Sequence, residues 1–272
     1  MSSKTSIHEP LRPTRRTMVR SAAWTVPVVA VAATAPAYAT SACRDGQYRI
    51  RWASEYNSST KKATANRTST SGSGTLGNAD LTLTITNEFG GSMGAGSANP
   101  NLGESNLTAT TYNVAGVGAP GLTIMQRVTT GTTWWNNSLR YALPEPRSGN
   151  FQRVTLTFNR PVWDLKFTIT DIDSNDGQYQ DRVFVSGNPT YTVNSGISGD
   201  GLSGTPWRPV DDDQNWDPQT QSNGNVTVDY AGKPSASVYT ITYWNDQTGN
   251  LSGNGLQGVF LGTLTFGAET CP

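Results

Sequence analysis

Apolar and polar residues alternate with a period of two in short runs along most of this chain. Successive side chains of a β-strand point to opposite faces, so such runs are typical of strands with one buried face. The two strongest runs, residues 154–158 and 163–169, are separated by Arg160-Pro161, which we interpret as a turn that makes them a β-hairpin. Their apolar members are Val154, Leu156, Phe158, Trp163, Leu165, Phe167 and Ile169.

Shorter runs of the same kind recur along the chain, mostly bounded by Gly, Pro, Asn or Asp: Tyr48-Ile50-Trp52, Leu81-Leu83-Ile85, Leu122-Ile124, Val183-Val185, Tyr191-Val193, Val226-Val228 and Tyr239-Ile241-Tyr243. The last run, residues 259–266, changes face at Gly262, which predicts a β-bulge. No segment after residue 40 sustains a helical apolar stripe. Strands with one apolar face must pack in two layers, so we predict an all-β fold, a two-sheet antiparallel β-sandwich similar to a jelly roll.

Two stretches lack this alternation and predict long loops rich in Gly, Ser, Thr and Asn. Residues 57–79 have almost nothing to bury, so we expect a mobile loop there. Residues 87–121 are rich in Gly, Asn and Ala and predict a long excursion on one edge. Because the strand-dense part begins near residue 122, we expect one domain, residues 40–272, with a loop-rich N-terminal third, residues 40–121.

The first 39 residues have the order of a secretory signal: positive charge, an uncharged stretch, then small residues. Four arginines lie between residues 12 and 20, no charge occurs from Ala22 to Ala35, and Ala37-Tyr38-Ala39 fits a signal-peptidase site. The segment Thr14-Arg15-Arg16-Thr17-Met18-Val19-Arg20 resembles the twin-arginine consensus, and the leader is similar to actinobacterial twin-arginine (Tat) signals. The resemblance implies export, with a mature chain that starts near Thr40 and is extracellular or associated with the cell surface.

Removal of this leader changes the charge and the chemistry of the chain. The leader holds five of the 20 Lys and Arg residues and one of the 20 Asp and Glu residues, so the mature chain has a net charge of −4. A nucleic acid partner is therefore not expected, because binding needs a basic face. The sole histidine, His8, also leaves with the leader, which excludes a Ser-His-Asp or Cys-His apparatus.

The two cysteines stand at opposite ends of the mature chain, at Cys43 and Cys271. An even number in an exported protein predicts a disulfide, which would bring the first and last structured segments side by side. The alternative is that Cys43 is a lipidated N-terminal cysteine, although the preceding Thr40-Ser41-Ala42 lacks the Leu typical of a lipobox. We expect no transmembrane anchor in the mature chain, because no apolar segment follows Cys271.

An acidic segment follows the strongest predicted strand and is the first candidate metal site. Carboxylate and carboxamide oxygens are the ligands that calcium prefers. If the strand continued, Asp171 and Asp173 would share a face about 6.6 Å apart. The segment is not an EF-hand, because Asp176 stands at the position of the required Gly, and a solvated acidic turn is the alternative interpretation. The candidate ligands are Asp171, Asp173, Asn175, Asp176 and Asp181.

A second acidic segment, residues 211–217, gives a weaker metal prediction. Asp211, Asp213 and Asn215 have the alternate spacing of calcium loops, but Trp216 stands where such loops have Gly. A surface acidic loop is therefore the better-supported interpretation. Loops gather at the ends of a β-sandwich, so the two acidic segments could meet there and form one composite site.

Four tryptophans in loop-like contexts are candidate ligand-binding residues. Trp134 and Trp135 are adjacent, so both cannot face a core if they lie in a strand. Trp207 lies in a Pro-rich segment and Trp216 in an Asp-rich one. Exposed indoles stack on the apolar faces of sugar rings, which predicts carbohydrate binding. The alternative is that these side chains cover the ends of the sandwich.

Three classes of function are compatible with this sequence. The segment Arg153 to Gly187 resembles a strand pair with an acidic loop found in bacterial extracellular β-sandwich domains of unassigned activity, and this resemblance assigns no functional residue. The leading interpretation is a non-catalytic module that binds a glycan or cell-envelope component, with calcium-ordered loops. The first alternative is a glycoside hydrolase that uses carboxylates only. The second is a structural envelope protein.

Overall fold

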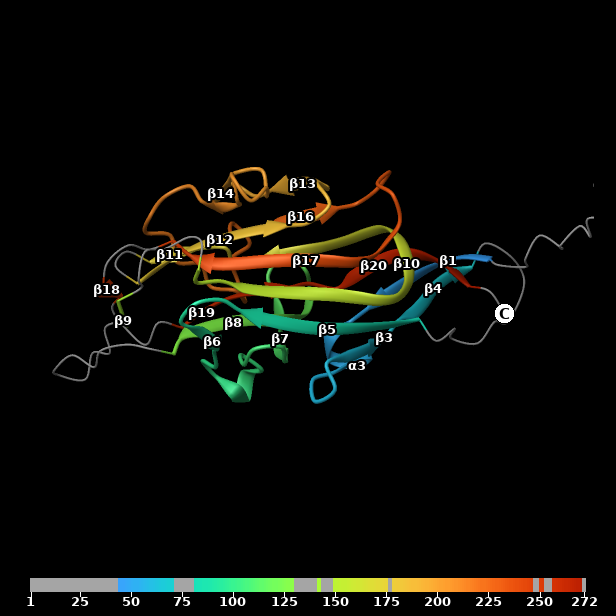
Figure 1. Ribbon diagram of the computed structural model, residues 1–272, viewed down its shortest axis with the longest axis horizontal. Coiled ribbons are helices and arrows are strands. Elements are labelled where there is room, and N and C mark those ends of the chain that lie inside the picture. Colours follow the sequence, from blue (N-terminus) through green and yellow to red (C-terminus); the bar gives the residue numbers. More distant parts are fainter. Residues whose placement is uncertain are drawn as a thin grey trace, which may run out of the picture. The chain divides into compact units, whose positions relative to one another are not determined.

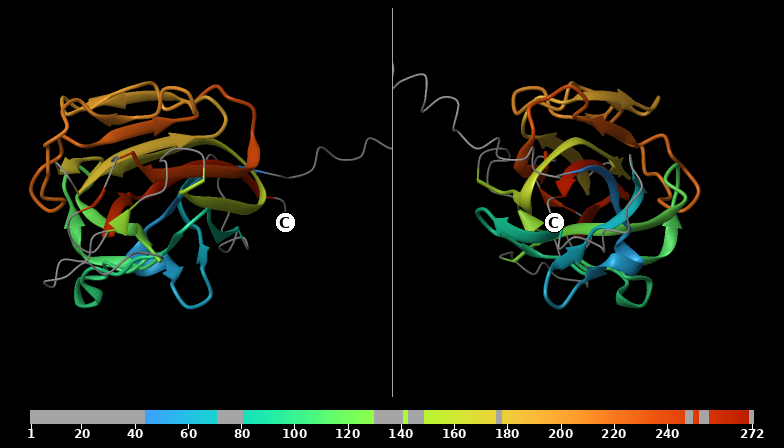
Figure 2. Two further views of the ribbon diagram at one scale, coloured as in Figure 1. Left: turned by 60° about the vertical axis from the view of Figure 1, so that its left-hand side comes forward. Right: turned by 90° about the vertical axis from the view of Figure 1, so that its right-hand side faces the viewer.

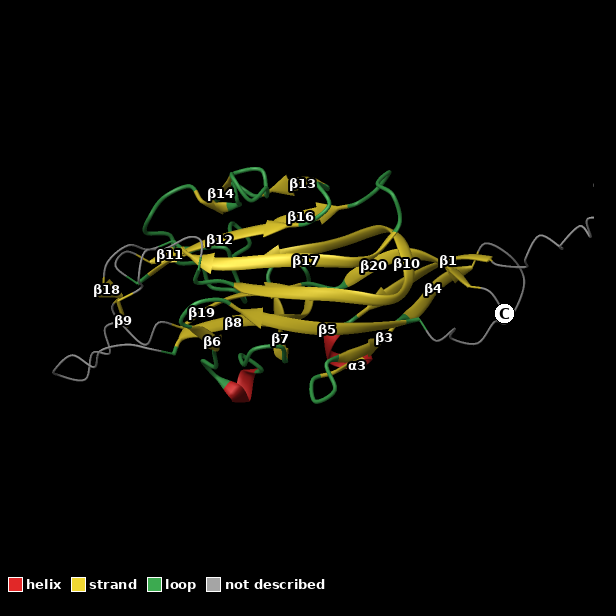
Figure 3. Cartoon of the chain, in the orientation of Figure 1, coloured by secondary structure: helices red, strands yellow, loops and turns green. Residues whose placement is uncertain are grey.

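Strands make up nearly all the regular structure in the computed structural model (Figures 1 and 3). The structure describes residues 44–70, 81–129, 141–142, 149–175, 178–246, 250–251 and 256–270. The predicted leader, both cysteines, Trp134, Trp135 and Asp176 lie outside these residues. The antiparallel sheets confirm the predicted all-β, sandwich-like fold. No helix in the described part of the chain is long and apolar enough to cross a membrane.

The first sheet, here called sheet I, is antiparallel throughout and contains residues 152–158 of the long strand β10. In spatial order it consists of β11 (Ser174–Asn175), β12 (Tyr179–Val185), β17 (Ala236–Asn245), the first half of β10 (Gln152–Thr170), β5 (Thr82–Phe89), β3 (Lys62–Thr64) and β2 (Tyr56–Asn57). Val154 and Leu156 of β10 are buried while the residues between them are partly exposed, as their alternation predicts.

The second sheet, sheet II, contains residues 163–170 of β10. On one side lie β16 (Val226–Asp229) and β13 (Thr190–Val193); on the other lie β19 (Leu256–Leu261) and β20 (Leu264–Thr270). Strand β19 leads to β8 (Ala119–Val128), β6 (Met93–Ala95) and β7 (Ala109–Val114), and β20 leads to β1 (Arg44–Ile50) and β4 (Asn66–Thr70). Both views in Figure 2 place the orange segment and the blue to green segments on opposite sides of β10 and the red strands.

The predicted hairpin at Arg160-Pro161 is wrong. The chain does reverse direction within β10 (Figure 1), but none of the strand pairings in the described residues joins its two halves. Each half pairs in a different sheet, because Pro161 has no N–H to donate to a ladder and Asp164 has a left-handed φ of 49°. Val162 and Leu165 are fully buried at the reversal. Strand β10 is therefore an arch over the core and connects the two layers.

The predicted bulge at Gly262 is confirmed. Strands β19 and β20 run along the same edge of β10, and their register against it shifts by one residue between Leu261 and Thr265. The N–H of Gly262 donates to the carbonyl of Thr168 at 2.7 Å within this irregularity. A one-residue insertion of this kind lets apolar side chains on both sides of the break face the same core.

The loop prediction for residues 57–79 is wrong in its first half. Strands β3 and β4 occupy part of it, and the small side chains of Ala63 and Ala65 are buried. Alanine buries too little surface to stand out in a pattern of apolar residues, which is why the sequence missed these strands. Residues 71–80 lie outside the described part. The short helix α3 (Trp52–Glu55) precedes β2 and buries Trp52, whose Nε1 donates to the carbonyl of Gly262 at 2.8 Å.

Residues 87–121 form an edge structure, as predicted. After β5 ends, β6, the 3₁₀ helix η1 (Pro100–Leu102) and β7 follow, and β6 and β7 both pair with β8 at the end of sheet II. Two small ladders complete the described elements, β14 (Ile197–Ser198) with β15 (Arg208–Pro209), and β9 (Tyr141–Ala142) with β18 (Asn250–Leu251).

The first and last described strands lie side by side, which confirms the prediction made from the two cysteines. Strands β1 and β20 form an antiparallel ladder of seven register pairs, from Arg44 opposite Thr270 to Ile50 opposite Leu264. Arg44 directly follows Cys43, and Thr270 directly precedes Cys271. The disulfide itself involves residues outside the described part and stays a prediction.

Candidate functional site

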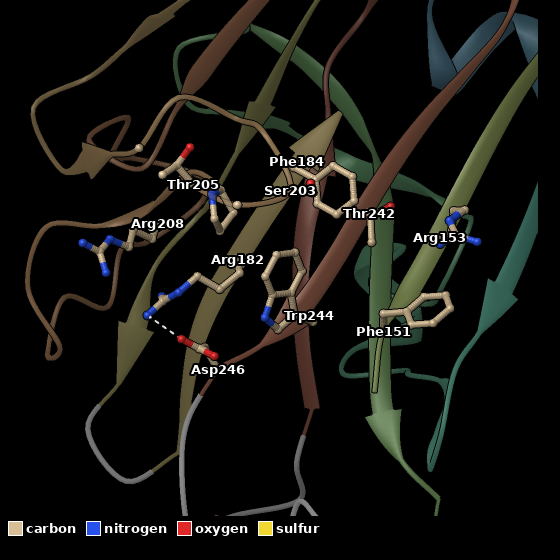
Figure 4. A pocket seen from close by; sticks show the side chains of 13 residues that line it. Phe151, Arg153, Arg182, Phe184, Ser203, Thr205, Arg208, Thr242, Trp244 and Asp246 are labelled. Atoms are coloured by element: carbon tan, nitrogen blue, oxygen red, sulfur yellow. Dashed lines mark ion pairs between the residues drawn. The ribbon is translucent and has the colours of Figure 1, made fainter. Parts of the chain in front are cut away.

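The outward face of sheet I carries an unusual group of aromatic and basic side chains. On β12 and β17, Arg182 is opposite Trp244 and Phe184 is opposite Thr242; on β10, Arg153 is opposite Thr242. Neighbouring positions such as Val183, Tyr243 and Val154 are buried toward the core, so alternation directs the first set outward. Three neighbouring strands therefore present one continuous face of rings and guanidinium groups (Figure 4).

Residues 199–208 form a wall beside this face. Trp207 exchanges two backbone hydrogen bonds with Val183 of β12, at 2.8 and 3.0 Å, which attaches the segment to the edge of the strand. Gly201 has a φ of 73° and lies directly on the buried indole of Trp207, where a Cβ would come within 2.3 Å of the ring. The Asp200 carboxylate accepts hydrogen bonds from the Leu202 N–H and the Thr205 hydroxyl, which holds the turn closed.

The face and the wall enclose a pocket of about 530 Å³, within the usual size of small-molecule sites. We call it the arginine pocket. Its lining is an even mixture of aromatic, basic and small hydroxyl-bearing residues: Phe151, Arg153, Arg182, Phe184, Gly199, Ser203, Gly204, Thr205, Pro206, Arg208, Thr242, Trp244 and Asp246. Side chains of this kind offer ring faces for apolar contact and hydrogen-bond donors for polar groups.

Two polar atoms of the arginine pocket are buried and have no hydrogen-bond partner, Trp244 Nε1 and Thr242 Oγ1. Both residues are more than nine-tenths buried. Leaving a buried polar atom unpaired costs about 1–3 kcal/mol, so a bound group that reached these atoms would offset this cost. The two rings of Trp244 and Phe184 are edge to face at 5.9 Å, which fixes the indole in place.

The three arginines of the pocket differ in their contacts. Arg153 pairs with Glu88 at 2.9 Å and stacks over the Phe151 ring at 4.8 Å. Arg182 is nearly buried and pairs with Asp246 at 3.2 Å (Figure 4). Burial lowers the pKa of the Arg182 guanidinium, Asp246 opposes this shift, and the like charge of Arg208 adds to it.

A second hollow of about 280 Å³, here called the aspartate pocket, lies at the end of β10 and β12. The Asp173 carboxylate accepts from the Trp216 N–H at 2.9 Å and the Tyr179 hydroxyl at 3.4 Å. The Asp181 carboxylate accepts from the Tyr243 hydroxyl at 2.7 Å and from the Asp173 N–H at 3.2 Å. The lining is acidic, amide-bearing and aromatic: Ala98, Glu104, Met125, Asp171, Asp173, Tyr179, Asn215, Trp216, Pro218, Gln257, Gly258 and Phe260.

Burial dominates the electrostatics of these aspartates. It raises the pKa of the Asp173 carboxyl to about 7, although the hydrogen bonds from Trp216 and Tyr179 and the interaction with the Asp181 carboxyl act in the opposite direction. Burial also raises the pKa of Asp171 and of Asp181 well above the ordinary range, and repulsion from Asp173 adds to both shifts. One carboxylate oxygen of Asp171 and both amide atoms of Gln257 are buried and unpartnered beside them. Burial therefore favours protonation of these carboxylates or a cation bound beside them.

The structure brings together only part of the predicted metal site. The two acidic segments do meet, because the Ser174 N–H donates to the Gln214 carbonyl at 3.0 Å and the Ser174 hydroxyl donates to the Asp211 carbonyl at 2.8 Å. Asp211 and Asp213 are exposed, however, and Asn175 is the last residue of the short strand β11, opposite Tyr179. Within the described residues, no group of three or more His, Cys, Asp or Glu side chains is arranged to hold a metal ion.

Strand β10 ends at Thr170, and Asp171 has a left-handed φ of 67°. The expectation that Asp171 and Asp173 share one face of a continuing strand is therefore wrong. The break instead turns Asp173 toward Asp181 of the neighbouring sheet I strand, as the hydrogen bond between them requires. Asp176 lies outside the described residues.

The predicted tryptophan set is only partly accessible. Trp207 is fully buried, so its assignment as an exposed stacking residue is wrong, and it is a core residue that holds the wall of the arginine pocket. Trp216 is half-buried and lines the aspartate pocket. Trp134 and Trp135 lie outside the described residues, and their predicted role stays a prediction.

Sequence reasoning missed the arginine pocket, although a signal was present. The alternation at Val183-Val185 and Tyr239-Ile241-Tyr243 assigns Arg182, Phe184 and Trp244 to the outward face. Large aromatic residues at outward positions of neighbouring strands indicate a binding face when those strands pair. That β12 pairs with β17 and β17 with β10 is the information that the sequence alone did not contain.

No protein-family model, curated protein or solved structure matches this chain.

Proposed function

We propose that this protein is an exported, non-catalytic β-sandwich that binds carbohydrate or another cell-envelope component in the arginine pocket. The observation that carries the proposal is the group of three aromatic residues in one pocket, Phe184 on β12, Trp244 on β17 and Phe151 just before β10, beside unpartnered buried polar atoms. Aromatic faces contact the apolar side of sugar rings, and donors such as Trp244 Nε1 bond ring hydroxyls. Preformed pockets of this size and lining are the usual form of ligand sites.

A Trp244→Ala variant tests this proposal on a glycan array. We expect the wild-type protein to bind a defined set of glycans, and the variant to bind them about 10- to 100-fold more weakly, because a buried aromatic anchor dominates binding energy. Trp244→Phe keeps a ring but removes the indole N–H, so it should lose less. Affinities measured by calorimetry on the array hits quantify the difference.

Trp163→Ala is the matched control, because Trp163 is a partly exposed tryptophan in the second half of β10 and does not line the arginine pocket. Its glycan affinity should equal that of the wild type. Failure of the wild-type protein to retain any glycan, or equal losses in the Trp244 and Trp163 variants, would refute carbohydrate binding at this pocket.

We further propose that calcium occupies the aspartate pocket and orders the loops around it. The unbalanced carboxylates of Asp171, Asp173 and Asp181 support this, and the unpartnered Gln257 amide, which is 5% exposed and lines the same pocket, is an independent observation. Calcium takes six to eight oxygen ligands from carboxylates, carboxamides, carbonyls and water. Because the described side chains do not form a closed cage, backbone carbonyls and water would have to complete the coordination.

Calcium should raise the melting temperature of the mature protein by about 5 °C or more at saturation, and EDTA should reverse the change. An Asp171→Asn, Asp173→Asn double variant should show no calcium shift in the same differential scanning calorimetry. Asp211→Asn, Asp213→Asn removes the same charge from exposed positions and should keep the shift. An unchanged melting temperature, or a shift that survives the first double variant, would exclude calcium at this pocket.

The alternative function is a carboxylate-dependent glycoside hydrolase at the aspartate pocket. One observation favours it: burial holds the pKa of Asp173 at about 7, which suits a general acid, and Trp216 lines the same hollow. Incubation of the array glycans with the protein distinguishes the two functions. Release of shorter products that Asp173→Asn abolishes would establish the hydrolase, whereas retention without release supports the binding module.

A further inference from the structure

Among the unpaired side-chain groups of the arginine pocket, the indole and guanidinium N–H groups can only donate, whereas the hydroxyls of Ser203 and Thr242 can donate or accept. Trp244 Nε1 can only donate, and the Arg208 guanidinium makes no hydrogen bond or ion pair within the described residues. The sole carboxylate in the lining, that of Asp246, is already paired with Arg182. A pocket with free donors and engaged acceptors is complementary to a ligand that is rich in acceptors.

The charge of the pocket points the same way. Three guanidinium groups face one carboxylate in the lining, and Glu88 outside it engages Arg153. Arg182 and Arg208 lie next to each other in Figure 4 and repel each other. Burial is the main cause of the lowered pKa of Arg182, and the charge of Arg208 adds a smaller effect in the same direction. An anion beside both groups would remove this repulsion and bind through charge-assisted hydrogen bonds, which are about twice as strong as neutral ones. The excess of positive charge is confined to this pocket, because the mature chain as a whole is acidic.

We infer that the arginine pocket recognises an acidic group on its glycan, a uronic acid carboxylate or a phosphate ester, through Arg182 and Arg208. The inference rests on the proposed function and names the class of ligand. The sugar ring contacts Phe184 and Trp244, and the acidic group lies toward the two guanidinium groups. Arg182 already donates to the Asp181 carbonyl at 2.8 Å and the Gln180 Oε1 at 3.2 Å, and it pairs with Asp246 at 3.2 Å. These oxygens compete with the acidic group for Arg182, so they limit the affinity for anions.

Calorimetry with two matched pairs of ligands tests the inference and separates the two sources of charge. Oligogalacturonate and its methyl ester differ in the carboxylate, and glucose 6-phosphate and glucose differ in the phosphate. We expect the acidic member of at least one pair to bind about tenfold more tightly than its neutral partner. Raising the salt concentration to about 0.5 M should reduce this preference, because the Debye length falls to a few ångströms.

Two substitutions examine the residues involved. Arg208→Ala removes an exposed guanidinium without leaving a buried charge behind, and should lower the acidic-to-neutral affinity ratio about fivefold or more. Asp246→Asn removes the competing carboxylate and should raise the ratio. Arg127→Ala is the charge-matched control, since Arg127 is exposed on β8 and does not line the pocket.

The outcomes separate the inference from the function on which it rests. Equal affinity for both members of each pair, with both lost in Trp244→Ala, would overturn the anionic preference and leave carbohydrate binding in place. A preference that Arg208→Ala leaves unchanged, or that Arg127→Ala reduces equally, would also overturn it. If none of these ligands and no arrayed glycan binds the wild-type protein, the proposed function fails and the inference with it.

Discussion

Replacing both Cys43 and Cys271 with Ser should lower the free energy of unfolding of the oxidised protein by up to about 5 kcal/mol, the chain-entropy value for so long a loop. The β1 and β20 ladder pairs Arg44 with Thr270, so continuing it by one residue would set the two cysteines opposite each other. Opposed residues of antiparallel strands have Cα atoms about 4.5–5.5 Å apart, within the range of disulfides. Urea unfolding of the wild-type and Ser variants, followed by tryptophan fluorescence, measures the difference.

The same substitution should leave folding itself intact. Seven register pairs already join β1 to β20 without the cysteines, and Tyr48, Ile50 and Phe266 are buried between them and the rest of the core. If the leader directs twin-arginine export, the chain folds in a reducing cytoplasm and the bond forms only outside. Reductant should therefore destabilise the wild-type protein and not the Ser variant. Two free thiols in the exported protein, or equal stability with and without reductant, would show that no bond forms.

The alternation of residues predicted most strands correctly because the physical constraint is local: a strand with one buried face must alternate. What the pattern could not give is which strands pair. Residues 154–158 and 163–169 would alternate identically in a hairpin and in an arch. Strands far away in the sequence determine which of the two forms. The first half of β10 pairs with residues 236–245, and the second half pairs with residues 226–229 and 256–270.

The two pockets differ in how far the sequence could predict them. Asp171, Asp173 and Asp181 are close along the chain, so their proximity in space was foreseeable. Their burial was not, because it depends on Tyr243 and Trp216, which come from elsewhere in the chain. The arginine pocket requires three strands and a wall segment to assemble. Each strand contributes only one or two residues, and the wall contributes mostly small residues of ordinary appearance.

In the presence of EDTA, the free energy of unfolding should fall by about 2–3 kcal/mol between pH 5 and pH 7.5. Burial raises the pKa of Asp173 to about 7, whereas an unfolded Asp titrates near about 3.9. The folded state therefore binds this proton more tightly than the unfolded state does. The resulting stabilisation is complete below about pH 4 and is lost as the pH rises through 7. Asp171 and Asp181 shift in the same direction and add to the slope.

This pH window isolates the buried aspartates. Exposed carboxylates finish titrating by about pH 5, and no histidine follows residue 8 that would titrate above it. Asp173→Asn mimics the protonated carboxyl and keeps an acceptor for the Trp216 N–H, so it should flatten the slope of stability against pH. Asp213→Asn, an exposed counterpart in the adjacent segment, should leave the slope as it is. Urea unfolding at half-unit pH steps supplies the measurement.

The same experiment with calcium added tests whether protons or a cation neutralise the charge of the buried carboxylates. A cation binds only the deprotonated carboxylates, so calcium should stabilise the protein most at pH 7.5 and least at pH 5, and thereby oppose the slope seen in EDTA. An identical slope with and without calcium would mean that protons alone neutralise Asp171, Asp173 and Asp181. A buried aspartate without a cation must either gain a proton or destabilise the fold. A free energy of unfolding that does not change with pH in EDTA would therefore show that these carboxyls are not buried as the structure places them.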